Sequence, residues 1–232
     1  MDPDDILALD FSYPGISFGY HSWALGAYLE MLEEFVEHSG AQYRLRAQRK
    51  LDAEKDSLDE IEYEQEIAYI EEAADTHIPG FARMSAILFL WGIFESTVFD
   101  ITSYCTRREH AVLKLRDVRV ESFEKQVAKY YEAVLRIDVP WSEAQRNALA
   151  VLHEVRNAIA HRNGQYADAS NDQKEKLRKT VNKVSGLKFA GTQLYVSEEY
   201  VKHSETLVLG ALDALNKLIQ ERYDGPKFEP DA

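Results

Sequence analysis

The scarcity of proline is the feature that most restricts how this chain can fold. Of its 6 prolines, only Pro79 and Pro140 lie between residues 15 and 225, and the 232 residues include only 11 glycines. Proline interrupts helices, and a β fold needs many turns rich in Gly and Pro, so this distribution favours long helices. A hydrophobic content of 45%, with 13 Tyr, 10 Phe and 3 Trp, argues against a disordered chain. The sequence therefore predicts an all-α protein.

The N-terminal third is expected to begin with an irregular lead-in over residues 1–20, which hold two prolines and two glycines. From about His21 a helix is predicted, with an apolar face made of one row at spacings of four and a second row that widens it (Trp23, Ala27, Met31, Phe35; Leu25, Leu29, Leu32, Val36). Ser39-Gly40 is a candidate break. Residues 41–60 are predicted to be a solvated, charged helix, and residues 76–80 a helix stop and restart in which Pro79 begins the next helix.

The most apolar helix is predicted between about residues 81 and 107. One of its faces is uniformly apolar (Ile87, Leu90, Trp91, Phe94, Val98, Ile101). Glu95 lies beside that face, where a carboxylate either points outward or pairs with a cation, and we favour pairing. The apolar run 86–94 is too short to span a bilayer and is predicted to be core. Cys105, the single cysteine, excludes an internal disulfide and is expected to be a buried structural thiol.

The last 110 or so residues are expected to form more helices and one hairpin. The expected elements are an amphipathic helix over 122–136, a helix over about 143–162 with Ser142 and Gln145 as its capping box, a short basic helix over about 173–185, a small β-hairpin over 187–196, a closing helix from Ser197 to about Tyr223, and a frayed tail from Gly225.

Charge is distributed unevenly along the chain, whose net charge is −13. Residues 1–80 hold 19 acidic and 5 basic residues, whereas residues 81–232 hold 21 and 22. So acidic a chain is a poor candidate for tight non-specific binding to duplex nucleic acid, which needs many Lys and Arg contacts. The acidic N-terminus lacks the basic start and apolar run of a secretory signal, so we expect a cytoplasmic protein that is not bound to a membrane. No acidic residue precedes a histidine by three positions, so a carboxylate-bridged metal site is not expected.

A candidate site lies at the end of the helix predicted over 143–162. Arg156 and Asn157 are followed by His161, and Asn163-Gly164 marks the helix end. A metal-independent ribonuclease needs a base for the ribose 2′-hydroxyl, an acid for the leaving oxygen and a cation for the phosphorane. Histidine and arginine can supply these roles. On an ideal helix Arg156 and His161 point about 140° apart, so a joint site needs a distorted helix end, a reaching arginine or a second copy of the helix.

The pattern Arg156-Asn157-x-x-x-His161 resembles the signature of the HEPN superfamily, with four residues between the arginine and the histidine. An apolar helix carrying Phe94-Glu95 before the motif, and a closing helix after it, also resemble that family. The resemblance covers roughly residues 78–223. It divides the chain into acidic long helices over 1–77, a HEPN-like core over 78–223 and a tail over 224–232.

The resemblance implies an up-and-down helical bundle of HEPN type, usually a homodimer, that acts as a metal-independent endoribonuclease without a cofactor. Such proteins serve as toxins, defence effectors or RNA-processing enzymes, with RNA as substrate and, in some cases, a neutralising or regulatory protein partner. The resemblance makes Arg156 and His161 catalytic and Asn157 their polar companion. Arg162 is then a substrate-binding residue and Glu95 a supporting one. Some toxin members carry a modified tyrosine two residues after the histidine, but here that position is Asn163, which argues against control by that modification.

Two alternatives compete with the nuclease. A non-catalytic HEPN-like module would engage a protein or nucleotide partner, with the acidic first 80 residues attracting a basic one. In a purely structural interpretation, Arg156 and His161 only stabilise a helix end through its dipole. His153, which lies four residues before Asn157, is interpreted as a packing residue rather than a second catalytic group.

Overall fold

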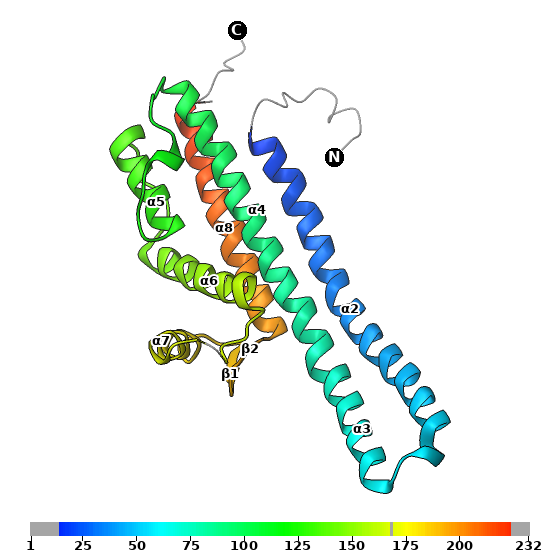
Figure 1. The fold of residues 1–232 in the computed structure, drawn as a ribbon. Coiled ribbons are helices and arrows are strands. Elements are labelled where there is room, and N and C mark those ends of the chain that lie inside the picture. The colour runs from blue at the N-terminus through cyan, green and yellow to red at the C-terminus, as the bar shows by residue number, and fades with distance from the viewer. Residues whose placement is uncertain (1–13, 168, 224–232) are drawn as a thin grey trace, which may run out of the picture. The chain divides into compact units, whose positions relative to one another are not determined.

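The chain is mainly helical, with one small antiparallel sheet (Figure 1). The computed structural model describes residues 14–167 and 169–223. Its main elements are α2 (Pro14–Glu54), α3 (Glu60–Glu72), a π-turn (Ala73–His77), α4 (Ile78–Arg108), α5 (Phe123–Tyr130) with a second π-turn (Tyr131–Leu135), α6 (Glu143–Arg162), α7 (Asn171–Val181), β1 (Leu187–Ala190), β2 (Gln193–Val196) and α8 (Glu198–Tyr223). Short 3₁₀ turns occupy Lys55–Ser57 and Leu115–Asp117. The prediction of an all-α fold with a small hairpin is confirmed, and the tail predicted to fray lies outside the described residues.

The chain packs as two compact units. The first contains residues 14–24, 88–163 and 202–223 of the described chain, and the second contains residues 25–87 and 164–201. Helices α2, α4 and α8 each contribute to both units. The boundary that the sequence placed after residue 77 falls inside the unbroken helical run formed by α3, the first π-turn and α4.

The core of the first unit is aromatic where α4, α5 and the segment before α6 meet. Trp91 and Phe94 of α4 lie with Phe123 and Trp141, at ring-centroid separations of 5.3 to 5.9 Å. The Trp141 indole donates a hydrogen bond to the Ala211 carbonyl of α8 at 2.9 Å, which satisfies its one polar group in the interior. The apolar face predicted for residues 87–101 is confirmed, because every one of its six side chains is buried.

That apolar helix also meets the composition of a membrane span. By length and hydropathy alone, the helical run Glu60–Arg108 could cross a bilayer, and half of its apolar window is buried inside the protein. A core helix passes the same test as a membrane span, so composition does not separate the two.

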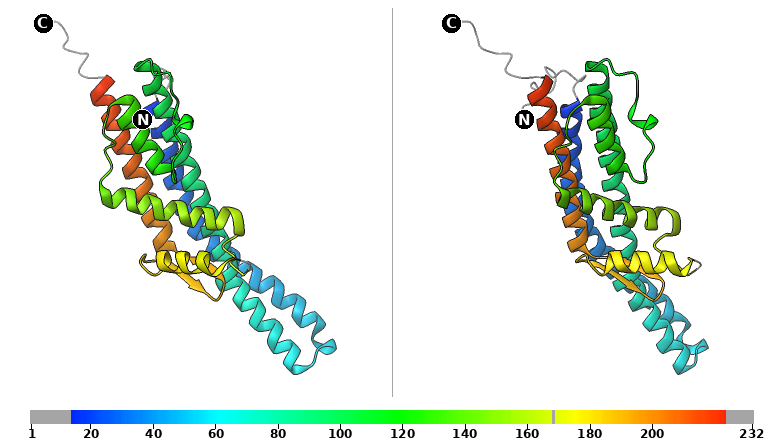
Figure 2. Two further views of the ribbon diagram at one scale, coloured as in Figure 1. Left: turned by 60° about the vertical axis from the view of Figure 1, so that its left-hand side comes forward. Right: turned by 90° about the vertical axis from the view of Figure 1, so that its left-hand side faces the viewer.

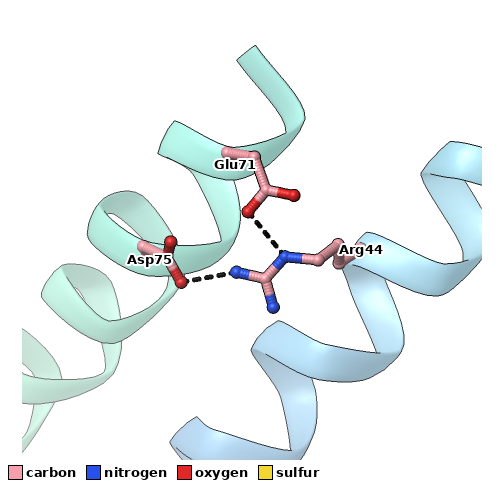
Figure 3. A network of polar contacts seen from close by, with 3 residues as sticks. All are labelled: Arg44, Glu71 and Asp75. Atoms are coloured by element: carbon pink, nitrogen blue, oxygen red, sulfur yellow. Dashed lines mark hydrogen bonds and ion pairs between the residues drawn. The ribbon is translucent and has the colours of Figure 1, made fainter. Parts of the chain in front are cut away.

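The second unit is built on an antiparallel pair of helices, α2 against the run of α3, the π-turn and the first part of α4. Arg44 of α2 donates to Glu71 at 2.7 Å and to Asp75 at 2.6 Å (Figure 3). Nearer the other end of the pair, Arg83 donates two hydrogen bonds to Glu33, at 3.0 and 2.7 Å. The sum of the two residue numbers in each pair stays nearly constant, as expected where two helices run antiparallel.

The predicted break at Ser39-Gly40 is wrong, because α2 continues through it as regular helix. A Cβ atom at Gly40 would lie 2.9 Å from the Ala74 carbonyl oxygen, so only glycine lets the two helices approach this closely. The glycine therefore reflects packing between helices rather than a helix end.

Two other predictions for this region are also wrong. Helix α2 begins at Pro14 rather than His21, so residues 14–20 of the expected lead-in are helical, with proline at the favoured first position; residues 1–13 lie outside the described chain. The predicted stop at residues 76–80 does not occur either. The π-turn lets the Ile78 N–H bond to the Ala73 carbonyl, and its wider ring accommodates Pro79, which cannot donate a hydrogen bond.

The apolar face of α2 is narrower than the sequence predicted. The row Leu25, Leu29, Leu32 and Val36 is buried as expected. In contrast, Trp23, Met31 and Phe35 are exposed by 72%, 67% and 61%. The spacing of four made both rows equally plausible as core, but among residues 14–167 and 169–223 only one of them is buried.

The C-terminal part of the second unit joins a basic helix to a hairpin (Figures 1 and 2). Helix α7 begins with a capping box between Ser170 and Gln173, and strands β1 and β2 pair with Leu187 opposite Val196. Arg178 of α7 donates to the Gly191 carbonyl at 3.3 Å and lies over the Phe189 ring. The predicted basic helix and hairpin are both confirmed.

Candidate functional site at the end of α6

Helix α6 carries the predicted site residues and is defined at both ends. Ser142 and Gln145 form the predicted capping box, with reciprocal bonds of 3.0 and 3.2 Å. The row Leu149, Leu152, Val155 and Ile159 is buried in the first unit. Burial of this row fixes the rotation of the helix about its axis, and therefore the directions in which the remaining side chains point.

The predicted end of α6 at Asn163-Gly164 is confirmed. Asn163 adopts a left-handed conformation (φ 49°, ψ 33°), and its N–H bonds to the Ile159 carbonyl at 2.8 Å. Gly164 follows with φ of 71°. Asparagine and glycine tolerate positive φ better than other residues, which explains why the helix ends here.

Arg156 lies between an amide on its own helix and a carboxylate on α4. Its Nη1 donates to Asn157 Oδ1 at 2.8 Å, and its Nη2 lies 3.9 Å from Glu95 Oε2. The pairing predicted for Glu95 is therefore observed, although the contact is long. Both side chains are about one-third exposed, and an ion pair of this kind contributes about 0–1 kcal/mol. The guanidinium is thus oriented but held only weakly, so an incoming anion could compete for it.

His161 is not part of that cluster. Its side chain is exposed and makes no hydrogen bond or ion pair with residues 14–167 or 169–223. It follows Arg156 by five residues on a helix that stays regular to Arg162, so the two side chains leave the helix about 140° apart. The structure therefore does not show the distorted helix end that could have joined them within one chain. Arg162 is partly buried and has an interaction partner of its own.

His153 lies closer to Arg156 than the sequence interpretation allowed for. His153, Arg156 and Asn157 stand at positions i, i+3 and i+4, which share one helix face. The imidazole stacks on Trp91 with ring centroids 4.8 Å apart and planes 14° from parallel. Burial lowers the pKa of His153 below that of an ordinary histidine. The packing role is thus observed, but its position beside Arg156 could have been read from the spacing alone.

Glu124 is a further polar residue of this region that sequence reasoning missed. It lies in the first turn of α5 and is only 3% exposed. Ser122 Oγ donates a hydrogen bond to its Oε1, while its Oε2 has no partner among the described residues. Nothing in the local sequence distinguishes this glutamate from a solvent-exposed one, because its burial depends on the packing of α5 against α4 and α6.

Among the described residues, no group of three or more His, Cys, Asp or Glu side chains could hold a metal ion. The polar groups gathered here are an arginine, an amide, two carboxylates and an imidazole. Groups of these types can bind a phosphate, orient it and exchange protons with it.

The fold and the site together define a mainly α-helical protein with a weakly paired arginine on one helix and an exposed histidine at the end of that helix. No protein-family model, curated protein or solved structure matches the chain.

Proposed function

We propose that this protein is a HEPN-type, metal-independent endoribonuclease that uses Arg156 and His161 in a site shared across a homodimer. The proposal is supported by the interactions and exposure of these two side chains. Arg156 is oriented by Asn157 and only weakly paired with Glu95, while His161 stands exposed at the helix end. One chain holds these groups too far around the helix to act together, and a two-fold axis would bring a second histidine and arginine to the same phosphate.

The proposed chemistry is transfer of the phosphoryl group to the neighbouring 2′-oxygen. One His161 accepts the 2′-hydroxyl proton, the O2′–P bond forms and the P–O5′ bond breaks, while the second protomer's His161 donates a proton to O5′. Arg156 neutralises the phosphorane oxygens with two N–H donors, and Asn157 orients the guanidinium. Arg162 contributes positive charge for the RNA backbone, and the products are a 2′,3′-cyclic phosphate and a 5′-hydroxyl.

The test is cleavage of labelled single-stranded RNA in EDTA, with analysis of the product ends. We expect His161→Ala to lower kcat/KM by about 10²–10⁴-fold, as for loss of a general acid or base. The matched control is His203→Ala, which removes an exposed histidine from α8 and should leave the rate unchanged. Equal rates for His161→Ala and the unsubstituted protein would show that the assignment is wrong.

Whether activity requires the dimer is tested by diluting the protein. Cleavage per protein chain should fall on dilution at the concentration where light scattering detects dissociation, because each site needs groups from two chains. A monomer with undiminished activity would contradict the shared site without contradicting nuclease activity.

A second candidate function, a module that binds a basic protein, is favoured by the helical pair of the second unit. Its surface exposes large apolar side chains, and exposed glutamates accompany them on α2 (Met31, Phe35, Ile61, Tyr69, Phe81; Glu30, Glu34, Glu37). Exposed apolar groups among acidic residues suit a partner helix with apolar and basic faces.

A Leu/Lys amphipathic peptide serves as the probe for this binding function. It should bind the unsubstituted protein and lose affinity, by about 10-fold or more, for Met31→Ser/Phe35→Ser, since each buried apolar side chain contributes about 1.5–3 kcal/mol. Val112→Ser is the control, because Val112 is 92% exposed in the first unit. Equal affinity for all three proteins would contradict this function.

A further inference from the structure

Oε2 of Glu124 is a buried polar atom of the first unit that accepts no hydrogen bond from the described residues. A buried acceptor without a hydrogen bond costs about 1–3 kcal/mol, so such an atom needs an explanation. Ser122 holds Oε1, which fixes the carboxylate and leaves Oε2 without a partner among the described residues. This glutamate is thus ready to accept one more hydrogen bond.

His153 is a group that could donate that bond, because Glu124 acts electrostatically on its imidazole. Glu124 is the carboxylate with the largest effect on its charge, and this effect favours the protonated imidazole. Burial against Trp91 opposes protonation more strongly, so the pKa of His153 remains below its usual value. At neutral pH the ring is therefore uncharged and stacked.

The other charged groups around His153 come from α4 and from α6 itself. Glu95 of α4 and Glu154 of α6 favour the protonated ring, whereas Arg156, one turn further along α6, opposes it. When His153 is uncharged it does not compete with Arg156 for the ion pair with Glu95. A protonated His153 would add a second cation on the same helix face, which repels Arg156 and competes for the same carboxylate.

We propose that His153 is a positioning residue for Arg156: uncharged and stacked on Trp91, it leaves Arg156 set between Asn157 and Glu95, and once protonated it turns to the free oxygen of Glu124 and releases that arrangement. The proposal rests on the proposed function for its consequence, namely that mild acid lowers the rate of RNA cleavage. The movement itself is a property of the described residues and can be measured without RNA.

Nuclear magnetic resonance of the full chain provides the test. The His153 ring protons, identified by their loss in His153→Gln, should show a ring-current shift from Trp91 at neutral pH and lose it on protonation. The Arg156 Nε–H resonance should move with the same midpoint. Glu124→Gln should lower the His153 midpoint by about half a pH unit or more, because it removes an opposite charge. Glu132→Gln, which changes an exposed glutamate beyond α5, is the control, and thermal unfolding of each variant verifies folding.

The outcomes separate the two proposals. The positioning role is overturned if Glu124→Gln leaves the His153 midpoint unchanged. It is also overturned if the Arg156 resonance does not shift as His153 titrates, and both conclusions hold even if the protein cleaves RNA. Coupled resonances support it, and the acid limb of kcat/KM should then share their midpoint and shift with Glu124→Gln. Coupled resonances in a protein that cleaves no RNA would instead leave the positioning role in place and remove the proposed nuclease.

Discussion

At the scale of single residues, burial decides which groups can react. Cys105 is fully buried in α4, and burial raises its pKa to about 12. Arg156 and His161 differ from it in that the first is partly exposed and the second is exposed. Helix α4 therefore carries an inert thiol, whereas α6 carries the arginine and the histidine that we assign to chemistry.

Cys105 should resist thiol reagents in the native protein. The reactive form is the thiolate, and at pH 8 a thiol with a pKa of about 12 is almost entirely protonated. We expect Ellman's reagent to react with the folded chain only as fast as the core opens, and with one thiol per chain at once in denaturant. Rapid stoichiometric labelling without denaturant would contradict the burial described for this residue. The thiol also makes the fold sensitive to alkali, because the unfolded chain loses this proton at a lower pH than the folded one.

At the scale of elements, the close approach of α2 to the run of α3 and α4 depends on Gly40. Arg44 forms two ion pairs across these helices, with Glu71 and Asp75, but these side chains are well exposed and solvent screens the pairs. The Arg83–Glu33 pair is better shielded from solvent. The buried row of α2 and the short distance at Gly40 matter more for packing.

Gly40→Ala should destabilise the protein although alanine is the better helix former. The added Cβ would lie 2.9 Å from a backbone oxygen that cannot turn aside, and overpacking of this kind costs about 1–3 kcal/mol. This exceeds the gain of about 1 kcal/mol in helix propensity. Gly92→Ala is the matched control, because its Cβ meets nothing within 4 Å and the variant should be more stable. Urea unfolding of both variants measures the difference, and a stabilised Gly40→Ala would refute the close approach.

At the scale of the whole molecule, local signals in the sequence predicted what local chemistry determines. The capping box at Ser142, the helix end at Asn163 and the hairpin at Gly191 depend on neighbouring residues, and all three were predictable. Three of the wrong predictions on the N-terminal helices needed knowledge of structure that the local sequence does not contain. Gly40 could be explained only by Ala74, Pro79 only by the π-turn, and Met31 only by the absence of a covering element within the described chain.

The candidate site shows the same division. Asn157, Arg156 and the helix end were predictable because they follow one another on α6. For Glu95 the sequence allowed either an outward-pointing carboxylate or one paired with a cation, and the pairing with Arg156 could not be derived from it. The stack of His153 on Trp91 could not be predicted, because it joins residues 62 positions apart. Glu124 could not be found at all, since a buried glutamate and an exposed one look the same in a single sequence.

The π-turn at Ala73–His77 also changes the direction in which the side chains that follow it leave the helix. It holds about one residue more than an α-helical turn would, so every later side chain is rotated by about 100° from the direction it would have in an uninterrupted α-helix. Glu71 and Asp75 reach Arg44, while Arg83, beyond the π-turn, reaches Glu33 on the same neighbouring helix. Deleting a single residue there would straighten the turn and point one of these two sets away from α2. The length of this segment is therefore as constrained as its composition.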